Sequence, residues 1–313
     1  SEDISNITIN NNYLATEGQY YIRFGNPNLN AVPVDTIDAT CNWLGTLNQS
    51  EAESRVVGGN HDFIPFLTDS TNTNPSNPGF IPLNNACKNN TQWFVNDNDN
   101  VGDTYTSALG DDTNLGSSDS PFRTIQHAIS VAKTGDTIWV DAGQYVENIV
   151  VDNSLYIFGH NRGISPNTGS REGESIIYPH TSAADAIIRV LSSNVTIDGF
   201  LLDGNNSLIS TGWTGTNGAD IDVYNGIAMS DSENTADQGG LQVRNNIIQN
   251  TSFFGIDIYG WDNYGHVVTT GNVVEDNLIK DLGHYNVGNG NDFWGVGVLV
   301  HSSNYTRVEN NVM

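Results

Sequence analysis

The sequence repeats a short unit in which an apolar strand runs into asparagine or aspartate and then into a second apolar pair. The copies span residues 7–14, 195–202, 241–248, 273–279 and 307–313. Asn246, Asn277 and Asn311 occupy equivalent places in the last three copies, at offsets of 31 and 34 residues. Periods of this size, built from short β-branched strands and polar corners, predict a coil whose turns carry loops of variable length. The helix formers that a helical or leucine-rich repeat needs between its strands are missing.

In such a coil, each strand pairs in parallel with the equivalent strand one turn away, and alternate side chains point into a narrow core. We expect Ile197, Val243, Ile247 and Ile279 to stack in that core. Asparagine suits the bends because it tolerates left-handed backbone angles, and stacked asparagines can form side-chain ladders from turn to turn. An antiparallel sandwich with Asn-rich turns is the alternative interpretation.

A second repeated piece precedes three of these units. Gly226, Gly255 and Gly295 each begin another short apolar strand, and we expect the three glycines to be equivalent positions of successive turns.

One amphipathic helix stands out against this strand-rich background. It is predicted over residues 120–133, with Ser120 as the N-cap and Pro121 in the first turn. One face of this helix carries the apolar side chains of Phe122, Ile125, Ala128, Ile129 and Ala132.

The segment from Ser120 to Tyr145, SPFRTIQHAISVAKTGDTIWVDAGQY, resembles the N-terminal capping helix and first turn of right-handed parallel β-helix proteins of the pectate-lyase-like group. Residues 39–46, 56–59 and 63–67 resemble the closing segment of such a coil in large secreted bacterial surface proteins. The resemblance implies an all-β, right-handed parallel β-helix whose helix plugs the open end of the coil. It also implies an extracellular or outer cell-surface location.

The resemblance further implies three parts. Residues 1–82 are interpreted as the C-terminal end of a first β-helix with its closing cap, and residues 83–92 as a linker. Residues 93–313 are interpreted as the N-terminal cap and first turns of a second β-helix that is incomplete at Met313. The fold alone implies no activity, because β-helices carry unrelated functions.

The charge balance restricts the partners. Lys and Arg total 11 and Asp and Glu total 36, which gives a formal charge of −25. So few cations argue against binding to nucleic acid or to an anionic membrane surface. No apolar run approaches the roughly 20 residues of a membrane span, so we expect no direct insertion. Polysaccharides or cell-surface glycans are the expected partners, and self-association is compatible with the sequence.

A calcium loop is one hypothesis for residues 97–112. Asp97, Asp99 and Asp103 are spaced as in the start of a calcium-binding loop, with Gly102 at the sixth place, and Asp111 and Asp112 supply further oxygens. Val101 at the fifth place and Ala108 at the twelfth depart from the pattern. A solvated polar loop is the alternative.

The two cysteines, Cys41 and Cys87, flank the proposed closing segment. In a secreted chain we expect them to form a disulfide, and two buried free thiols are the alternative.

Polysaccharide lyases of this fold would need an Arg or Lys base beside carboxylates that hold calcium. The candidate bases are Arg244 and Lys280, and the candidate carboxylates are Asp276 and Asp281. The hydrolase, lyase and epimerase motifs of the group are missing, so a solvated charged face is the favoured interpretation. A role without catalysis is therefore favoured, and a polysaccharide lyase is the activity expected if the chain is an enzyme.

Aromatic residues gather in the long loops. Trp213, Trp261, Tyr264 and Trp294 lie next to Asn and Asp, as in sugar-binding grooves, where rings stack on sugars and polar neighbours bind hydroxyls. Packing of these rings against the outer sheet is the alternative.

The sequence therefore predicts a segment of a large secreted bacterial β-helix protein that acts as an adhesin or scaffold and presents loops to glycans or surfaces. A calcium-dependent polysaccharide lyase, or another carbohydrate-active enzyme, is the second hypothesis. A structural filament or surface-layer component is the third.

Overall fold

The computed structural model describes residues 92–211, 218–229, 238–259, 269–283 and 295–313, together with residues 22–23, 37–38, 42, 44, 56–57 and 61–62. The chain divides into two compact units. One comprises residues 1–90 and 113–115, and the other comprises residues 91–112 and 116–313.

Only short pieces of the first unit are described. Ile22–Arg23 (β1) pairs in parallel with Val56–Val57 (β3), and Ile37–Asp38 (β2) pairs in parallel with His61–Asp62 (β4). Most residues of the proposed closing segment lie outside the described residues, as do both cysteines, so the disulfide stays a prediction.

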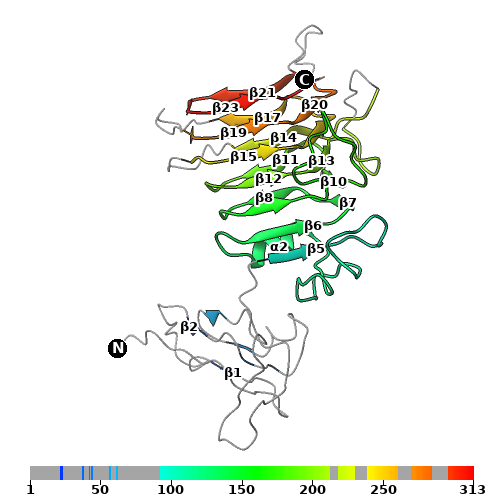
Figure 1. Cartoon of the computed structure of the whole chain (residues 1–313), viewed down its shortest axis with the longest axis vertical. Helices are drawn as coiled ribbons and strands as arrows, with labels where there is room; N and C mark the ends of the chain where they lie inside the picture. Colours follow the sequence, from blue (N-terminus) through cyan, green and yellow to red (C-terminus); the bar gives the residue numbers. More distant parts are fainter. Residues whose placement is uncertain are drawn as a thin grey trace, which may run out of the picture. The chain divides into compact units, whose positions relative to one another are not determined.

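The second unit is a parallel coil, and its strands stack in chain order from β5 to β23 (Figure 1). Sheet 1 of the described residues contains β5 (Gln92–Val95), β6 (Thr137–Val140), β9 (Tyr156–Phe158), β12 (Thr196–Asp198), β15 (Gln242–Arg244), β19 (Val273–Glu275) and β23 (Arg307–Glu309). Sheet 2 contains β7 (Gly143–Val146), β10 (Ser175–Tyr178), β13 (Phe200–Asp203), β16 (Ile247–Gln249) and β20 (Leu278–Lys280). Sheet 3 contains β8 (Ile149–Val151), β11 (Ala184–Val190), β14 (Val223–Met229), β17 (Phe254–Tyr259) and β21 (Val296–His301).

The chain visits the three sheets in turn, so one strand of each makes one turn of the coil. Every strand pairing among them is parallel, which excludes the antiparallel sandwich. A small parallel pair, Thr269–Thr270 (β18) with Ser303–Asn304 (β22), lies outside the three sheets. None of the helices in the described part of the chain is long and apolar enough to cross a membrane.

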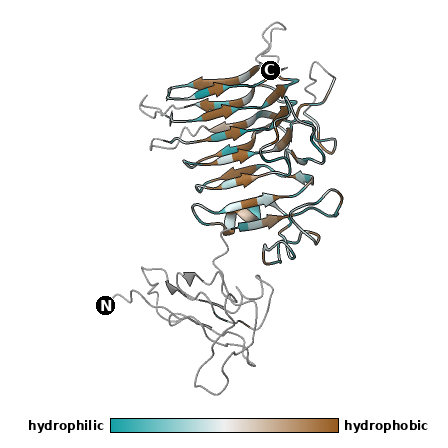
Figure 2. Ribbon diagram, viewed as in Figure 1, coloured by the Kyte–Doolittle hydropathy of each residue, from teal (hydrophilic) through white to brown (hydrophobic). Residues whose placement is uncertain are grey.

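The core is a set of apolar columns that run from turn to turn, and the alternation of apolar and polar residues is visible along the strands in Figure 2. In sheet 1, Ile197, Val243 and Val274 are paired in register and fully buried. In sheet 2 the core position is Ile248, which pairs with Leu202 and Ile279. The expectation for Ile247 was therefore wrong: it is half-buried, because neighbouring residues of a strand face opposite sides.

The corner between sheets 1 and 2 is built by asparagine, as predicted. Asn246 donates its backbone N–H and its side-chain amide to Oδ1 of Asn277, at 2.9 and 3.1 Å. Asn277 repeats both bonds to Asn311, at 3.0 and 2.9 Å. The residue before each of the three has a positive φ, and these residues are Asn245, Asp276 and Asn310. The ladder satisfies buried polar groups at the bend in each turn.

The glycine prediction was correct for two positions and wrong for the third. Gly226 and Gly255 stack in sheet 3, but the next member of the column is Gly297 and not Gly295, because Phe254 pairs with Val296. A Cβ on Gly255 would lie 2.4 Å from Ile279 Cγ2 and 2.7 Å from the carbonyl oxygen of Gly297. The column is glycine because the backbone and the core leave no room for a side chain.

The helix is shorter than predicted. It spans Ile125–Val131 (α2), and its N-cap is Thr124 rather than Ser120. Phe122 instead forms a parallel bridge with Val95 of β5, so it does not belong to the helix. Three of the expected apolar residues are buried on the helix, and they are Ile125, Ala128 and Ile129.

A carboxylate from the sheet region fixes the start of this helix. Glu147 accepts the backbone N–H groups of Ile125 and Gln126, both at 2.9 Å. The Thr124 hydroxyl accepts the N–H of His127 and donates to Asp112. The first N–H groups of the helix, which have no partner within the helix, are thereby satisfied.

Candidate functional site

The outer face of sheet 1 carries an unusual column of side chains. Residues in register on this face are aromatic in the early turns, at Phe94, Trp139 and Phe158. They are charged in the later turns, at Asp198, Arg244, Glu275 and Glu309. A solvent-facing strand position usually holds a polar residue, so the aromatic part of the column requires an explanation.

We define the aromatic patch as Tyr105, Trp139, Tyr156, Phe158 and Arg162. The ring centroids of Trp139 lie 5.1 Å from Tyr105 and 5.2 Å from Phe158, and Tyr156 lies 6.1 Å from Phe158. Tyr156 is 45% exposed, and Trp139 is partly exposed. Phe158 itself is buried, at 8% exposure, so the solvent meets this continuous set of rings mainly at Tyr156 and, in part, at Trp139 and Tyr105.

Arg162 lies on this surface as a fixed cation. Its Cζ is 4.1 Å from the centroid of Phe158 and 5.2 Å from that of Trp139, and the residue is exposed. The next residue anchors the segment, because the N–H of Gly163 donates to Asp198 Oδ1 at 3.0 Å. The planar guanidinium stacks on the rings while its N–H donors can meet a ligand.

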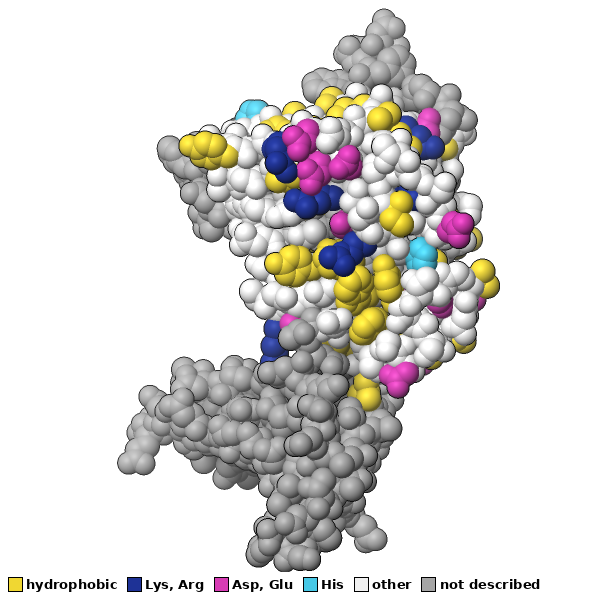
Figure 3. Space-filling model, in the orientation of Figure 1, with side chains coloured by type: hydrophobic (Ala, Val, Ile, Leu, Met, Phe, Trp, Pro, Cys, Tyr) yellow, Lys and Arg dark blue, Asp and Glu magenta, His cyan; other side chains and the backbone are white. Residues whose placement is uncertain are grey.

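The charged part of the column is internally paired. Arg244 Nε lies 2.9 Å from Glu275 Oε1, and Arg307 Nη2 lies 3.0 Å from Glu275 Oε2. Arg307 also contacts Glu309 at 3.2 Å. Figure 3 shows hydrophobic side chains gathered on one face of the coil, with Lys or Arg and Asp or Glu side chains next to them toward the C-terminal turns.

The lyase candidates are not brought together by an ion pair. Arg244 is paired with Glu275, and no ion pair among the described residues joins Arg244 or Lys280 to Asp276 or Asp281. Asp276 and Asp281 both have a positive φ, which assigns them to the corners of the coil. Their role in the structure is to turn the backbone, as asparagine does at the equivalent corners.

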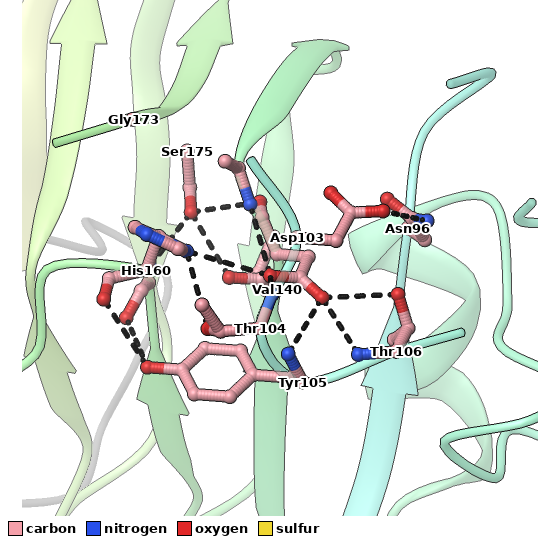
Figure 4. A network of polar contacts seen from close by, with 12 residues as sticks. Asn96, Asp103, Thr104, Tyr105, Thr106, Val140, His160, Gly173 and Ser175 are labelled. Atoms are coloured by element: carbon pink, nitrogen blue, oxygen red, sulfur yellow. Dashed lines mark hydrogen bonds and ion pairs between the residues drawn. The ribbon is translucent and has the colours of Figure 1, made fainter. Parts of the chain in front are cut away.

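The loop of residues 97–112 is held by a buried carboxylate that the sequence did not single out (Figure 4). Asp141 is fully buried, and it accepts the backbone N–H groups of Thr104, Tyr105 and Thr106 at 2.7–2.9 Å. It also accepts the hydroxyl of Thr106 at 2.9 Å. Burial and the neighbouring Asp141 carboxylate raise the pKa of the Tyr105 phenol.

His160 and Ser175 lie beside Asp141 without forming a catalytic triad. The Nδ1 atom of His160 is 3.4 Å from Asp141, but the Ser175 hydroxyl accepts the backbone N–H of His160 and not a ring nitrogen. That hydroxyl donates to the carbonyl groups of Val140 and Asp141. A base must contact the hydroxyl that it activates, so this cluster is a structural network.

Most of the predicted calcium ligands accept hydrogen bonds from backbone N–H groups. Asp97 accepts the N–H groups of Asp99 and Gln144, and Asp99 accepts that of Val101. Asp112 accepts the N–H groups of Arg123 and Thr124, both near the start of α2.

Asp103 accepts the side-chain amide of Asn96, and its other oxygen is buried without a hydrogen-bond partner. Burial is the main cause that raises the pKa of Asp103, and Asp141, Asp97 and Asp99 add to it. Asp111, the last of the predicted ligands, is exposed. Within the described residues, no group of three or more His, Cys, Asp or Glu side chains is placed to hold a metal ion, so calcium at this loop stays a prediction.

The predicted sugar-binding aromatics, Trp213, Trp261, Tyr264 and Trp294, lie outside the described residues. The aromatic patch was not predicted from the sequence, because the candidate sugar-binding aromatics were all taken from the long loops. The available signal was in the strands, where the alternation of Thr137 to Val140 and of Tyr156 to Phe158 assigns Trp139, Tyr156 and Phe158 to the outward face.

Comparison with known families gives a match over residues 108–313, more than half of the chain, to the family described as "Protein of unknown function (DUF1565)". The chain belongs to the DUF1565 family. The matched part of this DUF1565 chain begins in the loop that Asp141 holds and includes α2 and the coil from β6 onward. A search of curated proteins found no match.

Among solved structures, the DUF1565 chain is similar to a pectin methylesterase in complex with a hexasaccharide, with 15% identity and a TM-score of 0.29. The similarity covers 60% of this chain and 63% of that chain, so it spans less than two thirds of the esterase.

Proposed function

We propose that this chain is a glycan-binding scaffold, a segment of a secreted bacterial surface protein of the pectate-lyase-like group that acts as an adhesin. The observation that carries the proposal is the aromatic patch on the outer face of sheet 1. Partly exposed rings on a rigid sheet can stack on the faces of sugars, and a polar neighbour can bind hydroxyl groups.

The pairing of the charged side chains next to the patch supports binding rather than catalysis. Arg244, the candidate base on this face, is paired with Glu275, and Arg307 also contacts that carboxylate. Arg162 lies over the ring of Phe158, where its N–H groups can donate to a ligand and orient it. The formal charge of −25 disfavours long polyanions, so we expect a neutral polysaccharide to bind best.

The test is retention of the purified chain on a panel of neutral and acidic polysaccharides, with and without calcium. Binding should weaken by about tenfold or more in Trp139→Ala and in Tyr156→Ala, because each removes a stacking ring. The matched control is Tyr178→Ala, since Tyr178 is a half-buried tyrosine on sheet 2.

Retention without product, lost in both patch variants and kept in the control, is the expected result. Release of unsaturated sugars would instead favour the lyase hypothesis. Absence of binding to the whole panel, or equal binding by Trp139→Ala and the intact chain, would overturn the proposal.

We further propose that the coil is right-handed and that α2 acts as its N-terminal cap. The buried side chains of Ile125, Ala128 and Ile129, together with contacts between α2 and β5, β6 and β8, support this role. Helices that cover the end of a solenoid shield apolar surface that would otherwise lack a neighbouring turn.

A further inference from the structure

A second polar site lies away from the aromatic patch, where the connection from β13 enters β14. This connection, residues 204–222, is described except for residues 212–217, and it ends in Asp220 and Asp222. Neither residue belongs to the loop for which calcium was predicted.

Asp222 is fully buried. Its Oδ2 accepts the backbone N–H of Asn206 at 2.8 Å, and its Oδ1 is buried without any hydrogen-bond partner. Asn206 is itself fixed, because its side-chain amide donates to the carbonyl of Pro179 at 2.7 Å. The carboxylate is therefore held in one orientation with one oxygen unused, and an unused buried acceptor is costly.

Asp220, two residues earlier, has the same feature. Its Oδ1 is also buried without a partner. Burial and the charge of Asp220 raise the pKa of Asp222 to about 6, against hydrogen bonds from the backbone of Asn206 and Thr211. No Lys or Arg is among the groups that act on Asp222. A fully buried and a half-buried carboxylate, each with one buried oxygen that has no hydrogen-bond partner, thus lie near each other, and no cation acts on Asp222.

We propose that Asp220 and Asp222 bind a divalent cation of the calcium type. Calcium takes six to eight oxygen ligands in flexible geometry from carboxylates, main-chain carbonyls and water. The two aspartates would supply the charged ligands, and water or main-chain carbonyls would supply the rest. The ion would neutralise the two carboxylates and use both unpaired oxygens. It would also attach the end of the connection to the start of β14.

The experiment is calorimetric titration of calcium into the chelator-treated full chain at about pH 7.5, with magnesium in parallel, and thermal unfolding with and without calcium. One site should appear, with a Kd in the range of about 10⁻⁴–10⁻³ M that is seen for extracellular modules. Asp220→Asn and Asp222→Asn should each weaken that site by about tenfold or more and remove the calcium-dependent rise in Tm.

The control is Asp103→Asn, which alters the loop of residues 97–112 and should leave this site intact. Because Asp220 is half-buried, we expect Asp220→Asn to fold even if Asp222→Asn, at a fully buried position, does not. In that case Asp220→Asn alone decides the test. No calcium binding by the intact chain would overturn the proposal. Binding that is lost in Asp103→Asn and kept in Asp220→Asn would overturn it too.

Discussion

Asn246 donates both its backbone N–H and its side-chain amide to the side-chain oxygen of Asn277, one turn further along the coil. Asn277 makes the same pair of bonds to Asn311 and also donates to the carbonyl of Val243 at 2.9 Å. Each rung therefore fixes the next one. Asn277 is the middle rung and has partners on both sides.

Asn277→Ala should destabilise the coil strongly. The change removes the acceptor of two Asn246 donors and leaves a buried backbone N–H without a partner, so we expect a loss of about 2–4 kcal/mol in the free energy of unfolding. Urea denaturation measures this loss. Asn311→Ala should cost less, because Asn311 is half-buried and has a rung on one side among the described residues. Equal losses would contradict the ladder argument.

Gly255→Ala should be more harmful than an ordinary glycine substitution in a strand. The added Cβ would meet Ile279 Cγ2 at 2.4 Å and the Gly297 carbonyl at 2.7 Å, so we expect a loss of about 3 kcal/mol or more. Gly271→Ala is the control, because Gly271 has a φ of +67° and open space around its Cβ position. It should cost about 1 kcal/mol from backbone strain alone. The midpoints of thermal or urea unfolding compare the two.

The binding and lyase hypotheses predict opposite results for Arg244→Gln. If the face binds without catalysis, the variant keeps its glycan retention, because Arg244 is engaged with Glu275 and lies outside the aromatic patch. A lyase that used Arg244 as its base would lose product formation by several orders of magnitude. The measurement is retention together with ultraviolet detection of unsaturated sugars, with Trp139→Ala in parallel.

Stability should fall as the pH rises from about 4 to about 7 in calcium-free buffer. Burial, with a smaller effect of Asp185, raises the pKa of Asp257 to about 7, and the pKa of Asp222 is about 6. Both values lie above the ordinary 3.8, so the folded state binds more protons than the unfolded state between about pH 4 and pH 7. The stabilisation is complete below about pH 4 and is lost above the folded-state values.

Asp257→Asn should remove most of that dependence, because the amide resembles the protonated carboxyl and carries no charge. Its Tm at about pH 8 should exceed that of the intact chain, and the two should converge below about pH 4, where Asp257 is protonated in both the folded and the unfolded state. Asp119→Asn, an exposed aspartate, is the control. A Tm that rises with pH in the intact chain would contradict the assignment.

Ile125→Ala tests the helix as a cap. Ile125 is fully buried, so its truncation should cost about 2–4 kcal/mol and should reduce amide protection first in β5 and β6. Ser130→Ala, on the exposed side of α2, should leave the exchange of both strands unchanged. Hydrogen exchange read by mass spectrometry distinguishes local loss at these strands from uniform loosening of the coil.

The strand-and-asparagine repeat by itself determined the parallel coil and the ladder of Asn246, Asn277 and Asn311. These features depend on contacts between equivalent positions of adjacent turns, so the period of the sequence contains them. The start of α2 could not be predicted in the same way. It depends on Phe122 pairing with Val95 and on Glu147 receiving the first N–H groups of the helix, and neither partner is adjacent in sequence.

Tertiary structure alone decided the register of Gly297, the burial of Asp141 and the contact of Tyr105 and Arg162 with the outward-facing rings. The loop before Gly297 changes the spacing between turns, so counting from glycine to glycine chose the wrong residue. Tyr105, Trp139 and Arg162 come from three separate segments, and they meet because the coil returns each turn to the same face. A periodic sequence specifies which residues stack, whereas the lengths of its loops determine which distant side chains share a surface.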